Sequence, residues 1–321
     1  MDTSQPDYRR YLDPDVLAKI SGLELRARLI VEGFFSGMHH SPTHGASVEF
    51  ADHRAYAQGD DLRYIDWKLF GKTDKYYIKE FEQETNLDVM LVVDNSESMH
   101  YRGASGAKAS DRVGMTKFEY ATAVSAAISY LALQQQDSVG LSLFDERLTE
   151  FLKPSNSMLH WKTLVQELSG QAGRAKTSLE RVLHELAERL GHRMLIMLIS
   201  DLFDDCDEIL RGLKHLRYRH HEIVVMNVWD AAELTFPFSG PMMFDGLESM
   251  GKLLVDPRSL RDRYLEEVER FRKRLRSGCG HMQIDYVVFN TTDALDIALS
   301  GYLATRSARL RQRSSRVLGA G

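Results

Sequence analysis

An almost continuously apolar run at residues 87–93, ending in Asp94, constrains the fold of this chain more than any other segment. Such runs, rich in branched side chains, are typical of central strands in parallel sheets that helices cover on both faces. Residues 194–200 and 223–228 contain two further runs of this character. The sequence therefore predicts an α/β domain built on a mostly parallel sheet, with these three segments as buried strands.

Capping and turn signals place the other elements. Residues 116–119 form a capping box, and Asp256-Pro257 has the cap-then-proline order that opens a helix. The chain upstream of the sheet predicts one helix followed by a strand-rich segment. Helices are expected at 13–35, 116–136, 157–168, 178–190, 207–218 and 257–276, strands in 46–86 and at 138–144, 147–152 and 281–289, and a short hairpin at 244–255.

Asp94, Ser96 and Ser98 alternate directly after the first buried strand. In extended backbone the three side chains would point the same way, just beyond the carboxyl end of a strand, where open α/β sheets bind ligands. Hard oxygen ligands suit Mg²⁺ or Mn²⁺ better than zinc. The alternative is a polar, serine-rich turn with a purely structural role.

A loop threonine, Thr177, and a later strand that ends in Asp201 extend this pattern. Together with the Asp-x-Ser-x-Ser segment they resemble the metal-ion-dependent adhesion site of von Willebrand factor A domains. The resemblance implies a von Willebrand factor A-like fold, and a metal held by Asp94, Ser96, Ser98, Thr177 and Asp201.

Two features of the sequence bear on that resemblance. The adhesion-site family often has glycine after the last aspartate, whereas Leu202 follows here. Residues 177–180 also read as a helix capping box, which gives Thr177 a structural alternative to its role as a ligand.

Residues 50–67 and 79–86, which run directly into the segment at 94–99, resemble the signature of the bacterial family called domain of unknown function 58. Members of that family are typically encoded near AAA+ ATPases of the MoxR type and are thought to act as their partners. The resemblance therefore implies a MoxR-type ATPase as the partner of this chain.

A cluster of charges and bulky apolar side chains lies within that signature. One interpretation is a structural hairpin held by arginine–aspartate pairs. The other is a partner-recognition surface beside the metal, because weak surface ion pairs do not by themselves account for so dense a cluster. The candidate partner-binding residues are Asp60, Asp61, Arg63, Asp66 and Trp67.

Composition excludes several classes of function. The net charge of −5 gives no general attraction to nucleic acid, and two cysteines without paired spacing indicate neither a disulfide framework nor a zinc site. No run approaches the roughly 20 apolar residues that span a bilayer, and the polar start shows no signal-peptide core. We therefore expect a cytoplasmic protein without a membrane span. Its expected parts are an N-terminal segment at 1–86, a von Willebrand factor A-like domain at 87–303 and a basic tail at 304–321.

The function that best fits these features is non-enzymatic, metal-assisted protein binding. No Gly-rich loop ending in Gly-Lys-Ser/Thr is present, so ATP hydrolysis would come from the partner. One alternative is a magnesium-dependent phosphohydrolase with Asp94 as nucleophile, although Ser96 occupies the place where such an enzyme needs a second acid. The other is a structural scaffold with an inactive metal site.

Overall fold

The computed structural model describes residues 48–57, 65–83, 87–103, 115–169, 178–240, 242–246, 251–295 and 298–299. The chain divides into two compact units, one at Val31–Asn86 and one that combines Met1–Ile30 with Leu87–Gly321. This division groups Met1–Ile30 with the larger unit, whereas residues 1–86 were expected to form one N-terminal segment. The helix expected at 13–35 and the basic tail lie outside the described residues.

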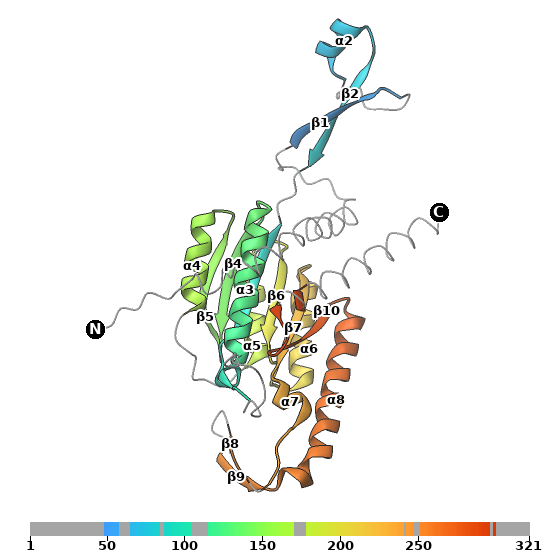
Figure 1. Ribbon diagram of the computed structural model, residues 1–321. Helices are drawn as coiled ribbons and strands as arrows, with labels where there is room; N and C mark the ends of the chain where they lie inside the picture. Colours follow the sequence, from blue (N-terminus) through green and yellow to red (C-terminus); the bar gives the residue numbers. More distant parts are fainter. Residues whose placement is uncertain are drawn as a thin grey trace, which may run out of the picture. The chain divides into compact units, whose positions relative to one another are not determined.

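The smaller unit contains an antiparallel pair of strands with a helix between them (Figure 1). β1 (Val48–Ala55) pairs with β2 (Tyr77–Gln83), and α2 (Trp67–Thr73) lies in the connection. Asp66 begins the helix, because its Oδ1 accepts hydrogen bonds from the backbone N–H groups of the second and third helical residues. The strand-rich character predicted for this segment is present.

The larger unit is built on one six-stranded sheet with the order β10-β7-β6-β3-β4-β5. Every pairing in it is parallel except that of β4 with the edge strand β5. The three strands predicted to be central are β3, β6 and β7, and all lie inside the sheet, which confirms the predicted mostly parallel α/β architecture. The strands are β3 (Asp88–Asp94), β4 (Ser138–Phe144), β5 (Leu148–Ser155), β6 (Leu195–Ser200), β7 (Glu222–Trp229) and β10 (Asp285–Asn290).

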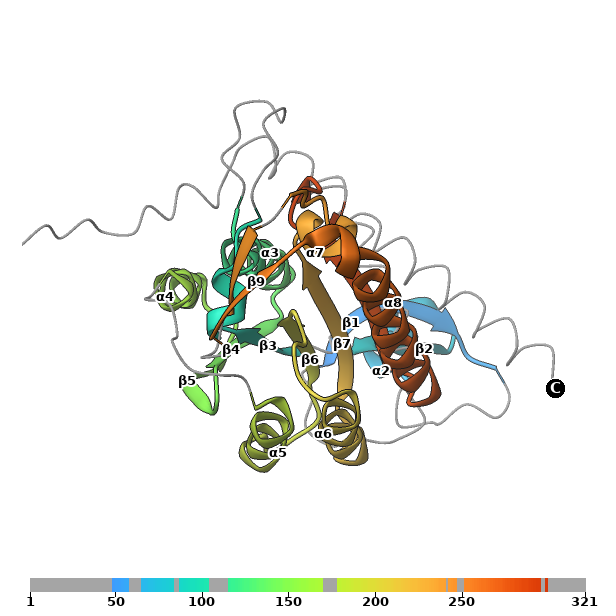
Figure 2. The ribbon, with the colours of Figure 1, turned by 90° about the horizontal axis from the view of Figure 1, so that it is seen from below.

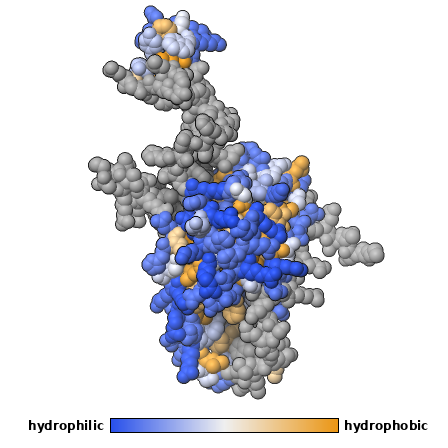
Figure 3. Space-filling view, turned by 180° about the vertical axis from the view of Figure 1, so that it is seen from behind, coloured by the Kyte–Doolittle hydropathy of each residue, from blue (hydrophilic) through white to orange (hydrophobic). Residues whose placement is uncertain are grey.

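Helices cover both faces of this sheet (Figure 2). α3 (Lys117–Gln134) and α4 (Met158–Leu168) lie on one face, and α5 (Leu179–Arg189) and α6 (Cys206–Tyr218) on the other. The apolar sides of α5 and α6 pack on the strands in a buried cluster that also takes in the end of α8 (Pro257–His281). The outer face on this side is mostly hydrophilic (Figure 3).

The C-terminal part differs from the prediction in two places. α8 continues to His281 and β10 begins only at Asp285, so the first residues of the expected strand 281–289 belong to the helix end and a turn. The five-residue α7 (Ala231–Thr235) was not predicted, because a helix this short shows no periodic pattern. The expected hairpin is present as β8 (Met242–Gly246) and β9 (Gly251–Val255).

Candidate metal site at the carboxyl ends of the strands

The register of the parallel strands places the candidate site residues side by side. Val93 is paired with Ile199, so the next residues along, Asp94 and Ser200, meet at the same edge of the sheet. Ser200 is in turn paired with Asn227 on β7. Three adjacent strands thus carry polar side chains close together near their carboxyl ends, which is where open α/β sheets bind ligands.

The Asp-x-Ser-x-Ser segment is compact, but it is not extended as predicted. Asp94 ends β3, while Ser96 caps a short 3₁₀ helix, η3 (Glu97–His100), that contains Ser98. The turn, and not strand alternation, brings the two serine hydroxyls together, with their Oγ atoms 3.1 Å apart. The predicted clustering of these side chains therefore occurs through a different local conformation.

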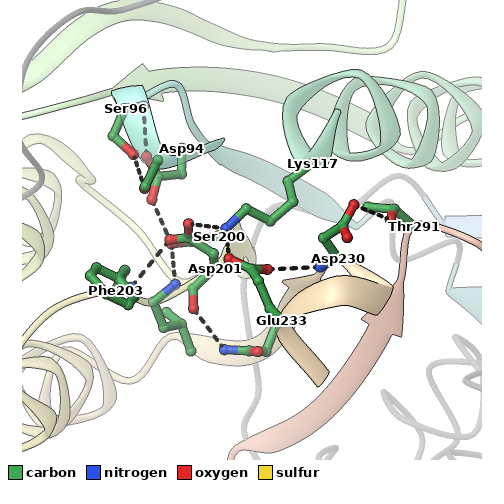
Figure 4. A network of polar contacts seen from close by, with 12 residues as sticks. Asp94, Ser96, Lys117, Ser200, Asp201, Phe203, Asp230, Glu233 and Thr291 are labelled. Atoms are coloured by element: carbon green, nitrogen blue, oxygen red, sulfur yellow. Dashed lines mark hydrogen bonds and ion pairs between the residues drawn. The ribbon is translucent and has the colours of Figure 1, made fainter. Parts of the chain in front are cut away.

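Asp94 is fully buried at the centre of the site. Its Oδ1 accepts the backbone N–H of Ser96 at 2.9 Å, and its Oδ2 accepts the hydroxyl of Ser200 at 2.6 Å (Figure 4). Burial, together with the negative charge of Asp201, raises the pKa of Asp94 to about 7, even though the hydrogen bonds from Ser200 and Ser96 act to lower it. A cation beside Asp94 would favour its ionised form.

Asp201 faces the same site, but its carboxylate is already paired with a buried lysine. Its Oδ2 lies 2.8 Å from Nζ of Lys117, and its Oδ1 accepts the backbone N–H of Phe203 at 3.2 Å. Nζ of Lys117 also lies 2.7 Å from Oε1 of Glu233 (Figure 4). Burial lowers the pKa of Lys117, but the two carboxylates outweigh it and the net shift is upward. The lysine is therefore a fixed positive charge inside the site.

Lys117 and Glu233 are the site residues that the sequence did not predict. Lys117 stands at the first position of α3, inside the capping box of Thr116 and Glu119, which was read only as a helix start. The position of Lys117 could have indicated a special role, because a cation at a helix N-terminus opposes the helix dipole and needs acidic partners. Its two partners lie 84 and 116 residues away in sequence.

The loop after β6 explains the leucine that follows Asp201. Leu202 has φ of 57°, a left-handed conformation that glycine adopts more easily, and its side chain is buried. The backbone here thus has the form that a glycine favours, while the leucine contributes to the core. The next side chain, Phe203, is turned outward and is 54% exposed.

Asp230, at the end of β7, has a structural role at this edge. Its Oδ1 accepts the backbone N–H of Ala232, and it forms a reciprocal capping box with Glu233 at the start of α7. Its Oδ2 accepts the backbone N–H of Gly103 at 3.2 Å and the hydroxyl of Thr291 at 3.3 Å. These bonds tie the loop after η3 to the ends of β7 and β10.

The remaining predicted residues fall into two groups. Asp66 and Trp67 belong to the smaller unit, where Asp66 caps α2 and Trp67 is 63% exposed. The others, Thr177, Asp60, Asp61 and Arg63, lie outside the described residues.

The oxygen atoms available as metal ligands suit a hard divalent cation. Each serine hydroxyl offers two lone pairs, and the two hydroxyls lie beside the buried carboxylate of Asp94, whose pKa is raised mainly by burial. Within the described residues, no three His, Cys, Asp or Glu side chains form a group that would hold a metal ion. A Mg²⁺ or Mn²⁺ ion would therefore depend on the hydroxyls of Ser96 and Ser98 together with Asp94.

A family model described as "Protein of unknown function DUF58" matches residues 52–274, more than half of the chain. The chain belongs to the DUF58 family. Relatives of this DUF58 protein include uncharacterized proteins from Mycobacterium bovis (Mb1516) and Mycobacterium tuberculosis (Rv1480). Each is 24% identical over 277 residues, which cover 84% of this chain and 83% of the relative.

Solved structures similar to this DUF58 protein include BatB from Bacteroides thetaiotaomicron, with a TM-score of 0.42 and 12% identity over 70% of this chain and all of BatB. The VWA domain of SpRpn10 has a TM-score of 0.37 and 13% identity over 66% of this chain and 92% of that domain. At these identities the likeness concerns the fold alone. No helix in the described part of the chain combines the length and apolar character needed to cross a bilayer.

Proposed function

We propose that this DUF58 protein is a metal-assisted protein-binding module whose partner is a MoxR-type AAA+ ATPase. The observation that carries the proposal is the pair of serine hydroxyls, 3.1 Å apart, beside the buried carboxylate of Asp94. The family signature at residues 50–67 and 79–86 supports the choice of partner.

The chemistry of these side chains favours binding. Ser96 and Ser98 are neutral, and both oxygens of Asp201 already accept hydrogen bonds. A magnesium ion held mainly by neutral oxygens stays electron-poor and accepts a further carboxylate. An aspartate or glutamate of the partner would supply it, and the side chains around the site would determine which partner fits.

The surroundings of Asp94 give little support to the phosphohydrolase alternative. Asp94 has no exposed surface, and direct attack on a bulky phosphate substrate needs more access to the carboxylate than contact with a small ion does. His100, on η3 beside the serines, bonds through Nε2 to Asn95 at 3.1 Å. It is therefore engaged elsewhere and is poorly placed to activate a serine hydroxyl.

A second contact with the partner is proposed at Trp67 in the smaller unit. Its indole is 63% exposed on α2, and exposed aromatic side chains are frequent anchors in protein interfaces. The neighbouring Asp66 holds the start of α2 through two backbone hydrogen bonds, so it would position Trp67. Trp67→Ala should weaken association with the ATPase and leave metal binding unchanged.

Calorimetric titration with Mg²⁺ and Mn²⁺ tests the metal site. The wild-type protein should bind one ion, and Ser96→Ala should weaken binding at least about tenfold, because one oxygen ligand is removed. Ser125→Ala is the matched control, since Ser125 is equally buried but donates its hydroxyl to the backbone carbonyl of Ala121 within α3. Equal affinities for the two variants would contradict the proposed ligands.

Association with the MoxR-type ATPase from the same genome tests the function. Binding should require Mg²⁺, fall on addition of a chelator and be lost in Asp94→Ala while circular dichroism shows an intact fold. Binding that persists in Asp94→Ala and resists chelation would overturn the proposal.

A further inference from the structure

Lys117 occupies an unusual position for a lysine at the start of a helix. Its side chain is 2% exposed, and its ammonium group lies between Asp201, which is 3% exposed, and Glu233, which is 18% exposed. Buried lysines are rare unless their charge is compensated. Here the charge meets one carboxylate at the end of β6 and one on α7, so Lys117 joins these two elements across the site (Figure 4).

The pairing leaves Asp201 with little capacity to bind a metal directly. One of its oxygens is 2.8 Å from the ammonium group of Lys117, and the other accepts the backbone N–H of Phe203. A direct bond to a metal would compete with the ammonium group for the same oxygen. Within the described part of the chain, the hydrogen bonds of Ser96, Ser98 and Asp94 at the site come from neutral backbone and hydroxyl groups.

We infer that Lys117 sets the net charge of the site, so that the metal-loaded form accepts a carboxylate from a partner. The inference rests on the proposed function and identifies the residue that makes it electrostatically possible. Asp94 and the two carboxylates that contact Lys117, those of Asp201 and Glu233, carry three negative charges. With a divalent ion and the ammonium group the charges cancel, whereas without the ammonium group one negative charge remains and repels an acidic partner.

This role has a signature that a purely structural role lacks. Two cations close together repel each other, so removal of the ammonium group in Lys117→Met should tighten Mn²⁺ binding roughly tenfold or more. The same substitution should weaken association with the acidic partner roughly tenfold, because the loaded site becomes negative. Damage to the fold would weaken both.

A compensating variant restores the charge. Lys117→Met/Glu233→Gln removes one positive and one negative charge, and the amide oxygen of glutamine can still accept the backbone N–H of Asp230 that Glu233 now accepts. Association with the ATPase should therefore return toward that of the wild type. Lys162→Met, at an exposed position on α4, is the matched control and should change neither measurement.

The experiment measures Mn²⁺ affinity by calorimetry without the partner, and association with the MoxR-type ATPase in excess Mg²⁺. Opposite shifts in Lys117→Met, with recovery of association in the double variant, support the inference. Parallel shifts, no shift, or a folded double variant without recovery would overturn the role of Lys117 and leave the proposed function standing. A wild-type protein that binds neither Mn²⁺ nor the ATPase would overturn the proposed function, and the inference with it.

Discussion

The ammonium nitrogen of Lys117 lies 2.8 Å from Oδ2 of Asp201, and both side chains are almost completely buried. When one member of such a pair is removed, an uncompensated charge remains in the interior, which typically costs about 3–5 kcal/mol. Lys117→Met should therefore lower the free energy of unfolding by roughly that amount in denaturant titrations. Lys117→Met/Glu233→Gln should recover part of the loss, and the exposed control Lys162→Met should show no measurable change. A loss no larger than that of the control would contradict the pairing.

The start of α5 depends on a side chain that is distant in sequence. Oδ2 of Asp204 accepts the backbone N–H of Leu179 at 2.9 Å, whereas Ser178, at the cap position, makes no capping bond through its side chain. Asp204→Ala should therefore cost about 1 kcal/mol of stability, as the loss of a helix cap does. Ser178→Ala should cost much less. Chemical denaturation of the two variants checks the prediction, and the reverse order would refute it.

His221 should make the protein less stable in mild acid. Burial, together with the nearby charges of His192, Arg219 and His220, lowers the pKa of this histidine from 6.5 to about 4. The folded state therefore binds fewer protons than the unfolded state between about pH 6.5 and pH 4. The contribution of neutral His221 to the free energy of unfolding is complete above pH 6.5 and is lost as the pH falls to about 4.

That loss amounts to about 3 kcal/mol for a shift of this size. His221→Phe keeps a buried ring but cannot take up a proton. Among the described residues the ring Nδ1 has no hydrogen-bond partner, so the substitution breaks no bond to them at that atom. Unfolding free energies of the two proteins should differ more at pH 7 than at pH 4.5 in favour of the wild type. An equal difference at both values would contradict the assignment.

The central strands and the core of the site were predictable because their signals are local. β3, β6 and β7 each carry an uninterrupted apolar run, since both faces of a central parallel strand are buried. Asp94, Ser96 and Ser98 lie within five residues, so the motif holds whether the backbone is extended or turned. The structure shows that the segment is turned, whereas the spacing of the three residues in the sequence is compatible with either a turn or a strand.

The surroundings of the motif were less predictable because they depend on contacts distant in sequence. Lys117 reads as an ordinary solvent-facing lysine until β6 and α7 place two carboxylates beside it. At the start of α5, the backbone N–H of Leu179 is accepted by Asp204, a contact that no local pattern predicts, while Thr177 of the expected capping box lies outside the described residues. In both cases the sequence contains the acidic side chain, but only the folded arrangement of the strands and loops determines which group that side chain contacts.

Phe203 should determine partner affinity without contributing to metal binding. Its neighbours in the loop have structural roles: Leu202 is buried, and Asp204 and Asp205 hold the starts of α5 and α6. The aromatic ring of Phe203, by contrast, is 54% exposed, two residues beyond Asp201. A partner whose carboxylate reached the site would be placed to cover this ring.

Burying a phenylalanine side chain contributes about 1.5–3 kcal/mol, which is roughly a tenfold to hundredfold change in affinity. Phe203→Ala should therefore weaken association with the MoxR-type ATPase by about tenfold or more and leave Mn²⁺ affinity unchanged. Tyr218→Ala is the matched control, because Tyr218 is 82% exposed at the far end of α6. Its loss should affect neither measurement. If Phe203→Ala lowered metal affinity as well, the ring would act through the fold of the loop, since the backbone N–H of Phe203 bonds to Asp201. If it left association unchanged, the partner would approach the site from another side.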